Sequence, residues 1–118
     1  MIRKSFLIFC LAGCFALPLL ASNEKPLTIV VPTAAGGGND AMARTIGQKL
    51  GVLLNRSVIV DNKAGASGAI GSLEVKRSQP DGHTLLFGTA SNLALYNLMA
   101  TKPQYDYLKD FITVAVVG

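Results

Sequence analysis

The stretch LTIVVPTAAGGGNDAMAR, Leu27–Arg44, decides the fold, because a strand, a glycine loop and the start of a helix follow one another within it. Its opening LTIVV is apolar and mostly β-branched, which is typical of a strand covered on both faces. Gly36–Gly38 permit a turn whose backbone amides no side chain screens. Asn39 or Asp40 can then cap a helix. Because the first amides of a helix attract negative charge, the stretch predicts a loop that holds an anion.

The residues before this stretch have the pattern of a secretory signal peptide. Arg3 and Lys4 form a short basic start, and Phe6–Leu20 is an apolar run broken only by a glycine and a proline. Such a run is too short to span a bilayer comfortably. We therefore predict a signal peptide over residues 1–21, a polar linker over 22–26 and a domain over 27–118. An uncleaved membrane anchor is the alternative.

Both cysteines lie in this leader. Leu11–Cys14 resembles the lipobox of a lipoprotein, but cleavage there would leave the apolar Phe15–Leu20 as a tether, so lipid attachment at Cys14 ranks second. Without the leader the chain has no cysteine, which excludes disulfides and thiolate metal sites. Loss of Arg3 and Lys4 also lowers the formal net charge from +4 to +2. That charge is too small to predict a nucleic-acid partner.

Downstream of Arg44 the hydrophobic pattern alternates between the period of a helix and that of a buried strand. The pattern predicts a helix from Asn39 with Met42, Ile46, Leu50, Leu53 and Leu54 inward, followed by a strand over Ser57–Val60 and a helix over Ala69–Ser78. It then predicts a strand over Thr84–Phe87 and a helix over Asn92–Ala100 with Leu93, Tyr96 and Met99 inward. A helical turn within Tyr105–Phe111 and a fourth strand over Ile112–Val117 complete the predicted elements. This order implies an α/β fold with a mostly parallel sheet and helices on both faces. The 118 residues suffice for at most one small domain.

Three of the predicted strands end in loops of small residues: Pro32–Gly38, Asn62–Gly68 and Gly88–Ser91. Parallel strands place their carboxyl ends at one edge of the sheet, where ligands bind in such folds. We therefore expect the three loops to form one ligand site. For Ser67, capping of the next helix is about as good an explanation as ligand binding. The same alternative stays open for Thr89 and Ser91.

A dinucleotide site is the sharpest rival interpretation of the first loop. Gly36-x-Gly38-x-x-Ala41 fits the G-x-G-x-x-G/A pattern, and Asp61 ends the next strand, where a ribose-binding acid would lie. Against it, Pro32–Ala35 separate the strand from the first glycine, and an exported protein meets little NAD. The sequence has no Gly-Lys-Ser/Thr, which excludes a P-loop.

No residue pattern in the sequence indicates an enzyme. His83 is the only histidine, and it lies in a predicted turn without acids at metal-ligand spacing. It precedes its strand, whereas Ser67 and Ser91 follow theirs, so no nucleophile has a base beside it. We therefore expect a binding protein without a cofactor, rather than an enzyme.

Four motifs in order resemble one known family: Val31-Pro32 with Gly36–Asp40, then Val60–Gly68, Pro80–Thr89 and Lys109–Phe111. From Pro26 onward the chain is similar to the Bug-type periplasmic solute-binding receptors of tripartite tricarboxylate transporters. The resemblance implies the N-terminal part of the first lobe of a type II periplasmic-binding-protein fold. Members of this family continue well past Gly118, so we expect a fragment, and the alternative is a truncated remnant that does not bind.

The resemblance further implies what the protein binds and how. A small carboxylate would be held in a periplasmic cleft and delivered to integral membrane subunits. Carried over by position, the ligand-binding residues are Thr33, Ala34, Ala35, Gly36 and Gly37 in the first loop, Gly65, Ala66 and Ser67 in the second, and Thr89, Ala90 and Ser91 in the third. The sequence departs from the family at Thr33–Ala35, where a second proline is usual, and at His83, where an aromatic residue is usual.

Overall fold

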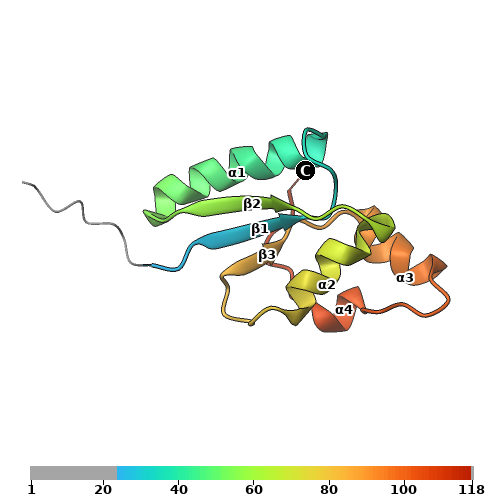
Figure 1. Ribbon diagram of the computed structural model, residues 1–118. Helices are drawn as coiled ribbons and strands as arrows, with labels where there is room; N and C mark the ends of the chain where they lie inside the picture. The colour runs from blue at the N-terminus through green and yellow to red at the C-terminus, as the bar shows by residue number, and fades with distance from the viewer. Residues whose placement is uncertain (1–23, 118) are drawn as a thin grey trace, which may run out of the picture.

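In the part of the chain that the structure describes, three parallel strands form the sheet (Figure 1). The computed structural model describes residues 24–117, so the predicted signal peptide lies outside the described residues and stays a prediction. The strands are β1 (Leu27–Val31), β2 (Val58–Asn62) and β3 (Thr84–Leu86), in the order β2-β1-β3. Ile29 pairs with Val60 on one side and with Leu85 on the other. The predicted parallel sheet is confirmed, with β1 at its centre.

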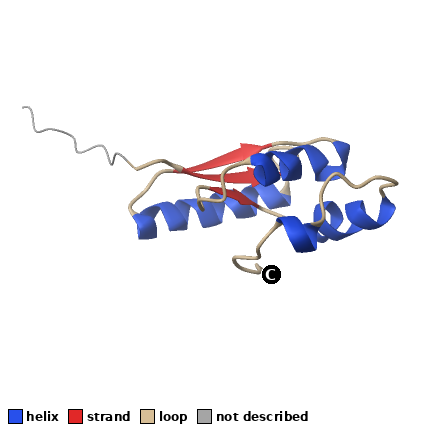
Figure 2. Ribbon diagram, turned by 90° about the horizontal axis from the view of Figure 1, so that it is seen from below, coloured by secondary structure: helices blue, strands red, loops and turns tan. Residues whose placement is uncertain are grey.

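Helices cover both faces of the sheet, as predicted (Figures 1 and 2). Helix α1 lies on one face and α2 on the other, where the short C-terminal helices also lie (Figure 1). This double cover explains the apolar run in β1, because Val31 faces α1 and Val30 faces the opposite side, and both are fully buried. The helical segments are α1 (Gly38–Leu54), the 3₁₀ turn η1 (Ala66–Gly68), α2 (Ala69–Arg77), the π-helical turn η2 (Ser91–Leu95), α3 (Tyr96–Met99) and α4 (Tyr107–Asp110).

The face of α1 that meets the sheet differs in part from the predicted one. Ala43 is fully buried, and a Cβ at Gly47 would lie 3.1 Å from Cγ1 of Val58, so small residues let the helix approach the strands closely. Leu50 packs on this core as expected. The prediction was wrong for three large side chains, which are 44%, 79% and 48% exposed: Met42, Leu53 and Leu54. Close backbone approach at the small residues turns these side chains toward the rim of the interface.

The helix predicted over Asn92–Ala100 is divided in the structure. A π-helical turn ends at Leu95, and α3 then runs only to Met99. Met99, expected to point inward, is 81% exposed, whereas Asn92 is buried. The polar residue takes the interior position because it has hydrogen-bond partners there, which are described below.

The fourth predicted strand does not form. Ile112–Val117 belongs to no sheet in the described part of the chain, although its sequence is almost continuously apolar. Ile112 and Val116 are more than 90% exposed. A strand is stable only when its backbone groups find a neighbouring strand, and within residues 24–117 this segment pairs with none.

We predict that the chain self-associates through this segment and the outer edge of β3. Changing Val114 and Val116 to lysine should raise the concentration at which dimers form by about tenfold, because apolar contact is lost and charge opposes strand addition. Sedimentation velocity over a concentration series measures this. Leu98→Lys is the matched control, because Leu98 is equally exposed but lies on α3. A parent chain that stays monomeric at every concentration contradicts the prediction.

Candidate functional site

The three loops at the carboxyl edge of the sheet meet around Gly68. A Cβ at this glycine would lie 2.5 Å from Cβ of Asn92 and 3.4 Å from Cβ of Pro32, so the second loop lies against the first loop and against the residue that directly follows the third. Lys63, directly after β2, donates its N–H to the carbonyl of Val31 at 2.8 Å and ties the first two loops together. The predicted convergence of the loops is therefore present in the structure.

The second loop has an uncommon backbone. Ala66 and Ser67 have φ values of +47° and +55°, in the left-handed region, and glycines with positive φ flank them. Each non-glycine residue in that region costs about 1–3 kcal/mol, and such residues cluster where ligands bind. Ser67 makes no side-chain cap to η1 or α2. The capping explanation for Ser67 is therefore not what the structure shows.

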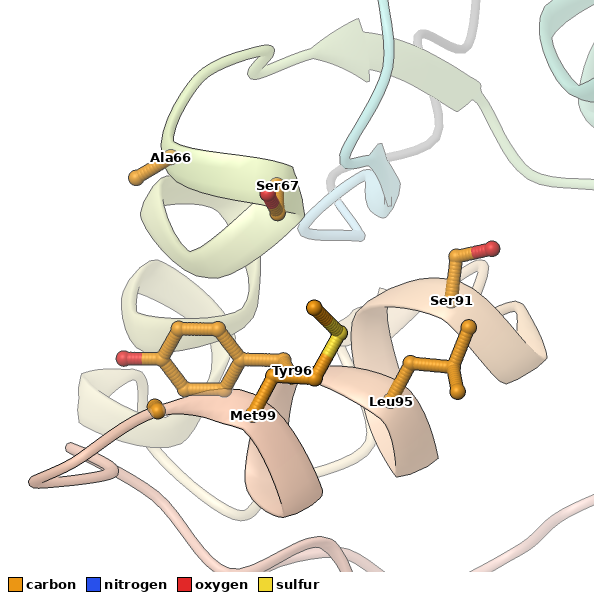
Figure 3. A pocket seen from close by; sticks show the side chains of 7 residues that line it. Ala66, Ser67, Ser91, Leu95, Tyr96 and Met99 are labelled. Atoms are coloured by element: carbon orange, nitrogen blue, oxygen red, sulfur yellow. The ribbon is translucent and has the colours of Figure 1, made fainter.

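A pocket of about 350 Å³ lies between this loop and the helical segment after β3 (Figure 3). Three of the predicted site residues line it: Ala66, Ser67 and Ser91. The Ser91 side chain, like that of Ser67, caps no helix. The rest of the lining comes from Leu95, Tyr96, Met99 and Ala100. The pocket thus combines a strained turn and two hydroxyl groups with an apolar side.

The third loop is held by Asn92, which the sequence patterns did not single out. Its Oδ1 accepts hydrogen bonds from the N–H and the hydroxyl of Thr89, at 2.5 and 2.7 Å. Its Nδ2 donates to Oγ of Ser72 at 3.2 Å, and that hydroxyl donates to the carbonyl of Gly68 at 3.0 Å. The Tyr105 hydroxyl donates to the Asn92 carbonyl. Both hydrogen-bond donors of Thr89, which was predicted to bind ligand, are therefore occupied by Asn92.

The first loop is braced by a buried carboxylate. Oδ2 of Asp40 accepts the N–H of Gly36 at 2.8 Å, and Oδ1 lies 2.9 Å from Nε of Arg44. Arg44 donates to Oδ1 of Asn62 at 3.1 Å, and the Asn62 amide donates to the carbonyl of Thr33 at 3.3 Å. The Arg44 guanidinium and the Gly36 amide hold the pKa of Asp40 below its usual 3.8. Asp40 is therefore ionised at neutral pH.

This arrangement changes two expectations about the first loop. The N-cap of α1 is Gly37, so neither Asn39 nor Asp40 occupies that position; Asp40 instead reaches back from the first turn. The Gly36 amide, expected to face a ligand, already has the Asp40 carboxylate as its partner. Oγ1 of Thr33 is buried without a hydrogen-bond partner among the described residues, which leaves it as the hydroxyl that the first loop can offer.

The remaining predicted site residues lie on the same loops but outside the pocket. They are exposed, and none lines it: Ala34, Ala35, Gly36, Gly37, Gly65 and Ala90. Apart from that of Gly36, which donates to Asp40, their backbone amides stay candidates for a ligand that extends beyond the pocket.

The geometry weighs against a dinucleotide at the first loop. A pyrophosphate at the start of α1 would meet the ionised Asp40 carboxylate beside the amides that should receive it. Asp61, the proposed ribose ligand, lies 3.3 Å from Nζ of Lys63, which also lies 3.4 Å from Glu74. Asp61, the acid of the fingerprint interpretation, therefore already has a partner within the chain.

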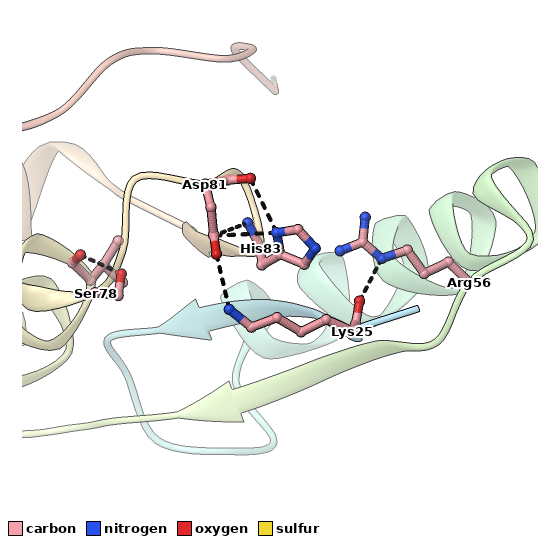
Figure 4. Close-up of polar contacts among 6 residues, drawn as sticks. Lys25, Arg56, Ser78, Asp81 and His83 are labelled. Atoms are coloured by element: carbon pink, nitrogen blue, oxygen red, sulfur yellow. Dashed lines mark hydrogen bonds and ion pairs between the residues drawn. The ribbon is translucent and has the colours of Figure 1, made fainter. Parts of the chain in front are cut away.

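His83 lies beside Lys25 and Asp81 at the amino edge of the sheet (Figure 4) and does not line the pocket. Its carbonyl accepts the N–H of Thr28 at 2.7 Å, which fixes it at the start of β3. Its own N–H and the ammonium of Lys25 lower the pKa of Asp81 to about 2.

The described residues include no group of three His, Cys, Asp or Glu side chains placed to hold a metal ion. None of their helices has the length and apolar character needed to cross a membrane.

Comparisons with known proteins give a consistent result. The model of the tripartite tricarboxylate transporter family receptor matches residues 42–118. Protein BugT of Bordetella pertussis is 37% identical over 115 residues, which cover 94% of this chain and 35% of BugT. MatC from Rhodopseudomonas palustris, solved with bound malate, superposes with a TM-score of 0.67 at 34% identity, over 73% of this chain and 29% of MatC.

A second R. palustris protein, solved with adipate, superposes with a TM-score of 0.65 at 32% identity, over 70% of this chain and 28% of its own. The chain thus spans about a third or less of the length of each of these proteins.

Proposed function

The chain belongs to the tripartite tricarboxylate transporter receptor family, and from this membership we propose that it forms part of one lobe of a periplasmic receptor for a small carboxylate. A receptor of this kind captures its ligand and delivers it to integral membrane subunits. Export by the predicted signal peptide would place it in the periplasm. Because the chain spans about a third of BugT, the proposal concerns one wall of the binding site.

The observation that carries the proposal is the pocket at the carboxyl edge of the sheet. Ser67 and Ser91 bring hydroxyl groups to it from two different loops. The left-handed turn at Ala66 also lines the pocket, and in this proposal its backbone amides are further donors to the ligand. Neutral donors of this type hold a carboxylate by charge-assisted hydrogen bonds. The Thr33 hydroxyl, buried and unpartnered among the described residues, is a further donor on the first loop.

The ligands of the solved relatives support the same chemical class. MatC was solved with malate and a second relative with adipate, and both molecules are small dicarboxylic acids. A second lobe that closes over the bound acid would complete the capture, as in other hinged binding proteins.

Isothermal titration calorimetry tests the proposal. We expect malate, adipate or citrate to release heat with the parent protein, and Ser67→Ala to weaken the best ligand by about tenfold, since one charge-assisted hydrogen bond is lost. Ser57→Ala is the matched control, because Ser57 is exposed at the amino edge of the sheet. Equal affinity of parent and Ser67→Ala contradicts the proposed role of this loop, and silence across the whole panel favours the non-binding remnant.

A further inference from the structure

The pocket beside Ser67 has two chemically different ends. Hydroxyl groups and backbone lie at one end, and the other is what we call the apolar wall: Leu95, Tyr96, Met99 and Ala100. No charged side chain is among the seven residues that line the pocket. Met99 is 81% exposed and Leu95 is 49% exposed, so a large part of this apolar surface is uncovered. Exposed apolar area beside a polar anchor is typical of a ligand surface.

The apolar wall is rigid at one point and adaptable at another. The Tyr96 ring stacks on Tyr105 with a centroid distance of 4.7 Å, and Tyr105 meets Phe111 edge-on at 5.8 Å. This aromatic stack fixes the position of the Tyr96 ring within the apolar wall. Met99 extends its thioether from α3 toward Ser67 (Figure 3). Methionine adapts its shape to different apolar partners, so the wall can follow ligands of more than one shape.

The polarity of the lining decides which acids suit such a pocket. A carboxylate at the Ser67 end is matched by hydrogen-bond donors, but a second carboxylate or a hydroxyl against Met99 would lose water without gaining a partner. Hydrocarbon placed there instead removes apolar surface from water on both sides. The lining therefore favours a ligand with one polar end and an apolar body.

We propose that this wall selects acids whose carboxylate is joined to a hydrocarbon chain or an aromatic ring, over compact hydroxy acids and tricarboxylates. The inference rests on the proposed function, because it assumes that a carboxylate occupies the Ser67 end. The selecting residues are Leu95 and Met99, with Tyr96 as the fixed support.

The test compares four acids by calorimetry on the same protein: hexanoate, benzoate, malate and citrate. We expect hexanoate or benzoate to bind at least about tenfold more tightly than citrate. Met99→Ser should weaken hexanoate by about fivefold and leave malate unchanged, because only hexanoate places hydrocarbon against the thioether. Leu98→Ser is the matched control: Leu98 is 82% exposed on the same helix but does not line the pocket.

Two results overturn the inference in distinguishable ways. If malate or citrate binds more tightly than hexanoate and benzoate, and Met99→Ser changes none of the affinities, the receptor function stands and the apolar selection is wrong. If none of the four acids binds, the proposed function itself fails and takes the selection with it.

Discussion

Asn92→Ala is expected to lower the free energy of unfolding by about 3 kcal/mol. The carboxamide accepts two hydrogen bonds from Thr89 and donates one to Ser72, and Asn92 is only 3% exposed. Alanine would leave these buried groups without partners and open a small cavity. Since the network joins the third loop to α2, we expect the pocket to lose its shape as well.

Urea denaturation followed by circular dichroism measures this change. Asn97→Ala is the matched control, because the Asn97 amide donates only to the carbonyl of Leu93 one helical turn away and is partly buried. The control should cost about 1 kcal/mol or less. If Asn92→Ala and Asn97→Ala lower the free energy of unfolding equally, the long-range network contributes nothing beyond a local hydrogen bond.

Gly68→Ala is expected to destabilise the protein by a similar amount, about 3 kcal/mol, for two reasons that add. Gly68 has φ of +89°, where a side chain is strained, and its new Cβ would lie 2.5 Å from Cβ of Asn92. Either the loop or the Asn92 network must shift to make room. We therefore expect ligand affinity to fall together with stability.

Gly82→Ala separates these two causes. Gly82 has φ of +77°, but nothing lies within 4 Å of the position of its Cβ, so only the backbone strain applies. Its expected loss is about 1 kcal/mol, measured by the same denaturation. Should Gly68→Ala cost no more than Gly82→Ala, the close contact between the second and third loops would not matter for stability.

Much of the fold could be predicted because its signals are local. The run LTIVV has the composition of a buried central strand, and the alternation of strands and helices leads to a parallel sheet. The first helix ends at a local signal as well, because Asn55 at its C-cap adopts the left-handed conformation that asparagine tolerates. The resemblance drawn from four motifs is confirmed by the family match over residues 42–118.

The wrong predictions concern contacts between distant parts of the chain. Ile112–Val117 has the sequence of a strand, but strand formation depends on a partner that the local pattern cannot supply. Met42 fits a helical apolar stripe, yet the approach of Ala43 and Gly47 to the sheet leaves it at the rim. Helical periodicity gives the direction of a face only to within about one residue per turn.

The candidate site was predicted at the level of loops rather than side chains. Parallel topology alone brings Ser67 and Ser91 to one edge, because both follow strands of one sheet. The role of Asn92 could not be predicted, since its partner Ser72 lies 20 positions earlier. The Asp40 contact with Gly36 was easier to predict, because an acid in the first helical turn commonly accepts a hydrogen bond from an amide before the helix.

The most direct test of the proposed carboxylate site is a titration with adipate followed by the amide resonances of the ¹⁵N-labelled protein. If loops at the carboxyl edge hold the acid, the amides of Ala66, Ser67 and Ser91 shift in a saturable way. The amides of Gly82 and His83, at the opposite edge, should then stay in place. Shifts centred on Gly82 and His83, with the amides of the serine loops unchanged, would contradict a carboxylate site at the carboxyl edge of the sheet.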